Sequence, residues 1–235
     1  MGRIFETRKH KMFARFDRMA KAFTRIGKDI SIAVRLGGPH PEYNPRLRMV
    51  IQNAKGVNMP KDRVEAAIKR ATAREEKDYQ EVIYEGYAPH GVPVLVECAT
   101  DNPTRTVANI RLHFAKNGGA MGNSGSVAFL FERKGVFKFD PEKLNLDESE
   151  LDLIDAGAEE IERQDDEITI YTKFTEFGNM QKFLESSNLE AKSSELHYIP
   201  TTTKELPEEQ QDEVLKLVEV LESDEDVQTV YHNLA

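Results

Sequence analysis

The stretches GVFKF (residues 135–139) and ITIYT (residues 168–172) belong to a run of six elements that decides the fold of the central part of this chain. Both are short and rich in β-branched or aromatic residues, which predicts strands. Apolar residues at helical spacing follow each of them. We expect the six elements at residues 135–139, 149–156, 159–161, 168–172, 176–185 and 195–199. Their order, β-α-β-β-α-β, is that of a ferredoxin-like unit.

The segments on either side of this unit complete a second α/β sandwich only when they are joined. Strands are predicted before the unit at residues 82–85, 92–98 and 126–131. Between the last two strands we expect a helix that runs through the apolar residues Val107, Ile110, Leu112 and Phe114. After the unit, we expect a helix at 208–221 and a strand at 227–232. Residues 134–200 are therefore expected as an insertion into a domain made of residues 78–133 and 201–235, with hinges near Arg133 and Pro200.

The N-terminal part has a different pattern, because its apolar residues recur at steps of three and four from about Lys9 to Leu36. That spacing is typical of an amphipathic helix. Gly37-Gly38-Pro39 ends the helix, and Asn44-Pro45 reads as an N-cap followed by a first-turn proline. The segment 58–62 (NMPKD) repeats this device before a third helix. The fold class is therefore α+β, with a helical bundle at residues 1–77 followed by the two α/β sandwich domains.

Charge is distributed very unevenly along the 235 residues, although the net charge is only −9. Residues 1–77 contain 19 Lys+Arg and 8 Asp+Glu, a net charge of +11, and the remainder contains 13 Lys+Arg and 33 Asp+Glu, a net charge of −20. A basic domain of this kind is typical of proteins that bind a polyanion. The acidic remainder faces solvent or a basic partner.

Cations of the first predicted helix fall in a sector nearly opposite its apolar stripe. A row of cations on a rigid helix suits the phosphates of a nucleic-acid backbone, although basic outer faces of helices are also often only solvated. The N-termini of the three helices are further places where a phosphate can bind. We predict that nucleic acid is bound by Arg8, Lys9, Lys11, Arg15, Arg18, Lys21, Arg25, Lys28, Arg35, Arg46, Arg48, Lys61, Lys69 and Arg70.

Several classes of function lack support in the sequence. The single cysteine, Cys98, excludes an internal disulfide and a cysteine-based zinc site, and the six histidines are scattered without an HExxH pattern. No nucleophile–base constellation is visible, so we expect no enzyme, no cofactor and no metal. The segment 117–126 has four glycines but neither GK[ST] nor GxGxxG, which favours a helix stop and turn over a phosphate loop. It remains a secondary candidate for backbone contact with a ligand.

The acidic segment 140–167 holds thirteen carboxylates against Lys143 and Arg163. A solvated face is the favoured interpretation, and an adaptor surface for another protein is the alternative. The N-terminus carries charges throughout, and no segment approaches the ~20 apolar residues that span a bilayer. We therefore expect a cytoplasmic protein that does not enter a membrane.

The sequence resembles the YebC/PmpR family over nearly its whole length. The matching motifs, in chain order, are GG at 37–38, NPRLR at 44–48, NMPKD at 58–62, YEGYAPHG at 84–91, TDN at 100–102, RTV at 105–107, KNGG at 116–119, GSV at 125–127 and FERKG at 131–135. The opening residues 2–6 (GRIFE) depart from the GHSKW-like segment usual in that family.

This resemblance implies a three-domain cytoplasmic protein that regulates gene expression. Some members of the family are described as DNA-binding transcriptional regulators. Others act on translation at the ribosome, among them a mitochondrial translational activator of cytochrome oxidase synthesis. The resemblance therefore predicts a DNA-binding transcriptional regulator, with a ribosome-associated translation factor that contacts ribosomal RNA as the alternative.

Overall fold

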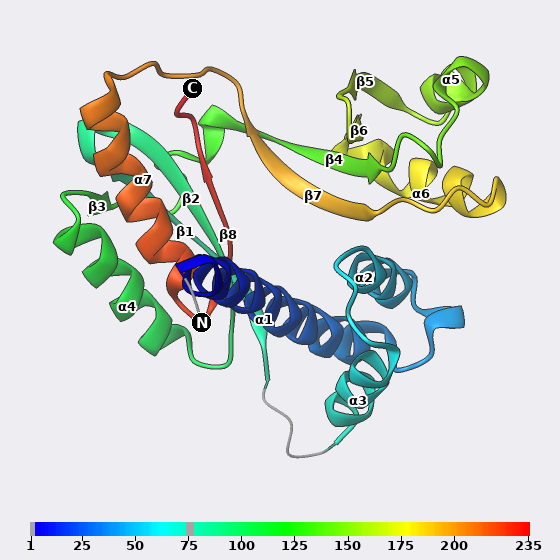
Figure 1. Ribbon diagram of the computed structural model, residues 1–235, viewed down its shortest axis with the longest axis horizontal. Coiled ribbons are helices and arrows are strands. Elements are labelled where there is room, and N and C mark those ends of the chain that lie inside the picture. The colour runs from blue at the N-terminus through cyan, green and yellow to red at the C-terminus, as the bar shows by residue number, and fades with distance from the viewer. Residues whose placement is uncertain (1–2, 74–77) are drawn as a thin grey trace. The chain divides into compact units, whose positions relative to one another are not determined.

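The computed structural model describes residues 3–73 and 78–235, and for residues 3–17 it describes the helical backbone alone. The chain divides into two compact units, residues 1–77 and residues 78–235 (Figure 1). The first is helical and the second contains two four-stranded sheets. The α+β class expected from the sequence is confirmed.

The first unit is built on one long helix against which two shorter helices pack. Its elements are α1 (Arg3–Gly37), the 3₁₀ turn η1 (Pro41–Tyr43), α2 (Pro45–Gly56) and α3 (Lys61–Ala71). Both α2 and α3 contact α1. The core includes Ile30, Leu47 and Ala54, each at most 1% exposed. These positions follow the three-and-four spacing of the sequence, so hydrophobic burial along one stripe of each helix stabilises the bundle.

Asn44 joins the end of α1 to the start of α2. Its side-chain amide donates to the carbonyls of Ala33 (2.7 Å) and Gly38 (2.9 Å), and its Oδ1 accepts from the Leu47 amide (3.0 Å). The predicted N-cap is therefore confirmed. Gly37 is required beside it, because a Cβ at this position would lie 2.7 Å from the Asn44 amide group. The same device does not recur before α3, where Pro60 itself is the N-cap and the helix begins one residue later than expected.

The first sheet of the second unit has the strand order β3-β1-β2-β8. Its strands are β1 (Gln80–Ala88), β2 (Val92–Thr100), β3 (Ala120–Met121) and β8 (Val227–His232). Helices α4 (Pro103–Lys116) and α7 (Glu208–Ser223) lie side by side against one face (Figure 1). The core between them includes Phe114, Leu217 and Val94, all fully buried. The sheet thus joins segments from before and after the ferredoxin-like unit.

One local expectation in this region was wrong. The strand predicted at 126–131 does not form: Ala128–Leu130 is a 3₁₀ turn, η3, and the next strand, β4, runs from Phe131 to Phe139. On α4, Leu112 is 49% exposed, whereas Thr106 is fully buried. The reason is that Thr106 forms hydrogen bonds inside the fold, so burial on this helix does not follow apolarity alone.

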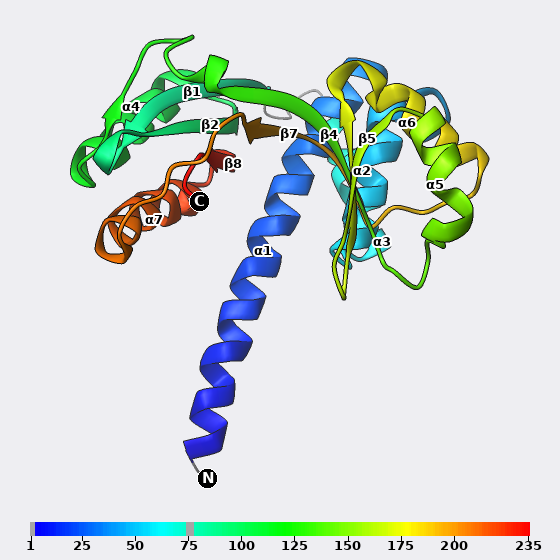
Figure 2. The ribbon, with the colours of Figure 1, turned by 90° about the horizontal axis from the view of Figure 1, so that it is seen from above.

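The second sheet has the strand order β5-β6-β4-β7, and all of its pairs are antiparallel. Its remaining elements are α5 (Leu146–Asp155), β5 (Ala158–Arg163), β6 (Ile168–Lys173), η4 (Phe174–Glu176), α6 (Phe177–Ser186) and β7 (Ser193–Pro200). Figure 2 shows α5 and α6 along one face of this sheet. Phe137, Leu153 and Met180, none of them exposed, form its core. Element order and strand order together are those of the ferredoxin-like unit predicted from the sequence.

Strands β4 and β7 connect the two sheets, and Tyr231 of β8 lies at the junction. Its hydroxyl donates to Glu97 (3.1 Å), and its ring meets that of Tyr198 edge-on at 5.4 Å. Burial raises the pKa of Glu97 and outweighs the lowering effect of the Tyr231 hydrogen bond. Burial also raises the pKa of Tyr231, and the negative charge of Glu97 raises it further. Burial at this junction therefore disfavours the charged form of both side chains.

Candidate nucleic-acid interface

The second half of α1 presents a row of basic side chains. Arg18 and Lys21 are exposed and Arg25 is half-buried. Because these residues are three and four positions apart, they lie on one side of the helix. Arg35 is exposed in the last turn, where a cation is also favoured by the helix dipole. This part of the predicted basic sector is therefore at the surface.

Lys28 does not lie on an open face. It is 8% exposed, and Ser31 and Ile32 at the same level of α1 are buried as well. A spacing of 100° per residue gives the direction of a side chain but not how far round the helix packing extends, so the expectation of an exposed Lys28 was wrong. The predicted residues Arg8, Lys9, Lys11 and Arg15 have side chains outside the described part of the structure.

The shorter helices add further exposed cations. Lys61 is exposed at the start of α3, where its Nζ lies 3.7 Å from Glu65, and Lys69 and Arg70 are exposed in the last turn. Lys55 at the end of α2 is exposed too, although sequence reasoning did not single it out. Arg63, also missed, extends its guanidinium over the Phe23 ring at 5.6 Å and so links α3 to α1. The sequence offered one signal for this contact: Arg63 lies one helical turn before the core residue Ala67, and so on the side of α3 that faces α1.

Two of the predicted phosphate-binding groups, Arg48 and the N-terminus of α2, form hydrogen bonds within the protein. Arg48 donates from Nη1 to the carbonyls of Pro41 (2.9 Å) and Glu42 (3.3 Å), which fixes η1 against α2. At the N-terminus of α2, the Leu47 amide is occupied by Asn44 of the chain itself. Arg46 lies half-exposed in the first turn of α2. The basic surface of the first unit is therefore formed by Arg18, Lys21, Arg25, Arg35, Arg46, Lys55, Lys61, Lys69 and Arg70, which we name the cationic surface.

The glycine-rich loop of the second unit is occupied from within. The carboxylate of Glu85 on β1 accepts from the amides of Gly125 (2.6 Å), Val127 (2.7 Å) and Ala128 (2.9 Å). Glu85 is only 6% exposed, and burial alone would raise its pKa, but these amides outweigh that effect and hold the pKa below its usual value. The loop donors therefore bind an internal anion. Sequence reasoning missed Glu85 because its partners lie 40 or more residues further along the chain.

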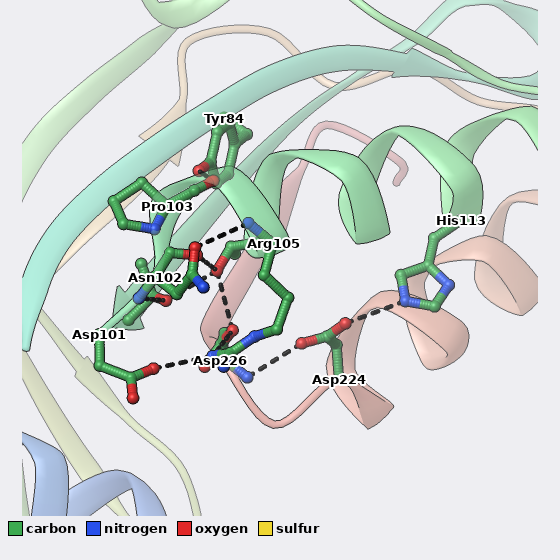
Figure 3. Close-up of polar contacts among 10 residues, drawn as sticks. Tyr84, Asp101, Asn102, Pro103, Arg105, His113, Asp224 and Asp226 are labelled. Atoms are coloured by element: carbon green, nitrogen blue, oxygen red, sulfur yellow. Dashed lines mark hydrogen bonds and ion pairs between the residues drawn. The ribbon is translucent and has the colours of Figure 1, made fainter. Parts of the chain in front are cut away.

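The motif residues at 100–106 tie α4 to the loop before β8 (Figure 3). Arg105 donates from Nη2 to Asp101 (2.9 Å) and to Asp226 (2.8 Å), and these carboxylates raise its pKa. The Thr106 hydroxyl bonds the second of these carboxylates at 2.8 Å. His113 of α4 pairs with Asp224 at 3.1 Å in the same region. These contacts hold α4 to the loop between α7 and β8, so their role is structural.

No group of three or more His, Cys, Asp or Glu side chains that could hold a metal ion occurs in the described part of the chain. The histidines whose partners are known pair instead with single carboxylates: His90 with Glu213 (2.9 Å) and His197 with Glu195 (2.8 Å). Among the described residues, no helix is both long and apolar enough to cross a membrane.

Comparison with known proteins agrees with this architecture. Residues 3–74 match a family model described as the TACO1/YebC protein N-terminal domain, and residues 79–234 match one described as the TACO1/YebC second and third domain. The chain belongs to the TACO1/YebC family. The boundary between the two matches lies where the structure separates its two compact units.

Two bacterial proteins are similar to this chain over its whole length. A protein of Anaeromyxobacter dehalogenans is 59% identical over 240 residues, and one of Cytophaga hutchinsonii is 57% identical over 235 residues, with at least 99% of each chain covered. Both are named "Probable transcriptional regulatory protein". The crystal structure of a conserved hypothetical protein from Aquifex aeolicus is 39% identical, covers 92% of this chain and 90% of its own, and superposes with a TM-score of 0.81.

Proposed function

We propose that this TACO1/YebC protein is a non-catalytic regulator of transcription that binds duplex DNA through the cationic surface of its first unit. The observation that carries the proposal is the charge division: a net charge of +11 in residues 1–77 against −20 in the remainder. The names of its relatives support the regulatory role.

The cationic surface binds nucleic acid in this proposal through contacts with phosphates. The cations of the surface come from three helices that share one core, so their backbone positions are fixed before binding. Ordered cations bind a polyanion with a smaller entropy loss than a flexible basic tail does, and each neutralised phosphate releases counterions. Contacts of this kind position a protein on nucleic acid without reading its sequence.

The acidic second unit has the opposite role in this account. Its net charge of −20 repels a phosphate backbone, and the loop donors that could have bound phosphate hold Glu85 instead. We assign nucleic-acid affinity to the first unit and leave the second to contacts with other partners or with solvent.

Charge reversal on the exposed face of α1 tests the proposal. Arg18→Glu with Lys21→Glu changes two exposed side chains, and Lys143→Glu with Lys216→Glu makes the same change of charge on exposed residues of the second unit. Affinity for a 20-base-pair duplex is measured by mobility shift and anisotropy between about 50 and 200 mM salt. If the first pair binds two phosphates, its loss lowers the slope of log affinity against log salt by ~1.8.

The proposal predicts that the α1 variant binds weakly, with a shallower salt slope, while the control variant binds like the wild type. Circular dichroism must show that both remain folded. Equal binding by the α1 variant and the wild type would mean that this face is only solvated. Equal loss in both variants would mean that the effect comes from net charge rather than from the cationic surface.

A further inference from the structure

Tyr43 is the most exposed of the large apolar side chains in the described part of the chain, at 84%. It ends η1, the short turn that joins α1 to α2. Single apolar residues at a surface are common and need no explanation by themselves. Tyr43 differs because of how the backbone under it is held and because of the charges around it.

The turn that carries Tyr43 is fixed on both sides. The Tyr43 amide donates to the His40 carbonyl at 3.1 Å, and the next amide, that of Asn44, donates to Pro41 at 3.2 Å. Arg48 donates to the same Pro41 carbonyl and to that of Glu42, and the buried Asn44 side chain bonds Ala33 and Leu47. An aromatic ring on such a turn loses little backbone entropy when a ligand covers it.

Cations flank the turn in the sequence, and the Arg48 guanidinium contacts the turn in the fold. Arg35 lies exposed in the last turn of α1, two residues from the Ala33 carbonyl that Asn44 binds, and Arg46 follows Tyr43 by three residues. Glu42 is the one carboxylate within the turn itself. An exposed ring on a turn that an arginine contacts resembles the sites at which proteins bind unpaired nucleotides, where bases stack on aromatic rings and cations bind the phosphates.

We propose that Tyr43 stacks on an unpaired base of the bound nucleic acid and thereby gives the protein a preference for single-stranded or looped segments over uniform duplex. This proposal rests on the proposed function and extends it: the cationic surface binds the phosphates of duplex DNA, and the Tyr43 ring adds affinity where a bound segment has unpaired bases. Phosphate contacts supply affinity for either form. The ring adds affinity only where a base is free to leave the stack.

The absence of tryptophan from the sequence makes a direct test possible. Tyr43→Trp in the full-length protein introduces a single indole whose fluorescence is quenched when a base stacks on it. The probes are a 12-nucleotide single strand, a hairpin with an unpaired loop and a fully paired duplex, each as DNA and as RNA. Phe129→Trp is the matched control, because Phe129 is 71% exposed but lies in the acidic unit.

The proposal predicts quenching of Tyr43→Trp by the single strand and the hairpin, none by the duplex, and none of Phe129→Trp by any probe. Tyr43→Ala is expected to weaken binding of the unpaired probes by roughly 5- to 150-fold, as loss of one stacked base does, and to leave duplex binding unchanged. Tyr43→Phe should restore binding. Quenching by either DNA or RNA supports stacking. Quenching by only one of them shows which sugar the site accepts, and equal quenching shows that it accepts both.

Two results would overturn the proposal in different ways. If the duplex binds the cationic surface but no probe quenches Tyr43→Trp, the stacking role is wrong and the proposed function stands. If no probe binds the wild-type protein at all, both proposals fail together.

Discussion

Replacement of Glu85 tests how the glycine-rich loop is held in place. Its buried carboxylate accepts three amide hydrogen bonds, at 2.6, 2.7 and 2.9 Å, and Glu85→Ala leaves all three donors without their partner. Glu85→Gln keeps one oxygen, which can still accept from Val127 and Ala128, but turns an amide NH₂ group toward the Gly125 N–H. The two variants therefore remove different shares of one site.

The size of the effect follows from those contacts. Hydrogen bonds to a charged group contribute ~1.5–3 kcal/mol each, so three contribute roughly 5–9 kcal/mol before the cost of burying the carboxylate. That cost is several kcal/mol, which leaves a net loss of about 2–4 kcal/mol in the free energy of unfolding for Glu85→Ala. Glu85→Gln loses one bond of the three and should cost about 1–2 kcal/mol.

Urea unfolding followed by circular dichroism measures the loss, and amide hydrogen exchange at residues 125–128 locates it. The lowered pKa of Glu85 sets the pH dependence: its contribution is present above the unfolded value near ~4.3 and is lost as the pH falls through the folded value. The difference between wild type and Glu85→Gln should be constant near neutral pH and shrink below about pH 4. Unfolding of Glu85→Ala within ~0.5 kcal/mol of the wild type would refute this reasoning, because such a change is typical of a surface substitution.

Three further substitutions probe the rest of the fold. Asn44→Ala should lower the stability of the helical unit by roughly 2–4 kcal/mol, since it removes an N-cap, a buried hydrogen bond and a part-buried one, and heat denaturation should show an early transition for that unit. Gly86→Ala should cost about 1–3 kcal/mol in urea unfolding, because its Cβ would lie 2.7 Å from the Ala120 carbonyl and 2.9 Å from the Phe114 ring. Glu97→Gln should be at least as stable as the wild type near pH 7. Because burial raises the Glu97 pKa in the folded state, the wild type is destabilised as this carboxyl ionises with rising pH, and the glutamine variant is not. The difference in stability between the two proteins should therefore vanish in acid.

The elements that sequence reasoning placed correctly are those in which burial follows a regular period. The stripe through Ile26 and Ile30 predicted α1, and the strand predicted at 227–232 is β8 without change. The β-α-β-β-α-β order was visible because each element of that unit has its own apolar face. Short-range signals such as Asn44-Pro45 gave a helix start because the cap and its partner are three residues apart.

The errors occur where a partner distant in the sequence decides the structure. Residues 126–131 have the composition of a strand, but the amides of Val127 and Ala128 bond to Glu85, and strand pairing begins only at Phe131. Lys28 has the helical angle of an exposed cation, yet it is buried. Arg48 resembles any other cation of a basic unit until the structure shows it bonding the Pro41 carbonyl. Neither period nor propensity records contacts of this kind.

Crosslinking of the full-length protein to DNA in cells, with ribosome co-sedimentation from the same lysate, tests the central claim most directly. The wild type is compared at matched expression with the double variant Arg18→Glu, Lys21→Glu. Both substitutions change exposed side chains of α1. The account predicts DNA crosslinks that the variant loses, with no saturable ribosome fraction. Saturable ribosome binding that the same substitutions abolish, without DNA crosslinks, would contradict the transcriptional claim and identify ribosomal RNA as the polyanion that this surface binds.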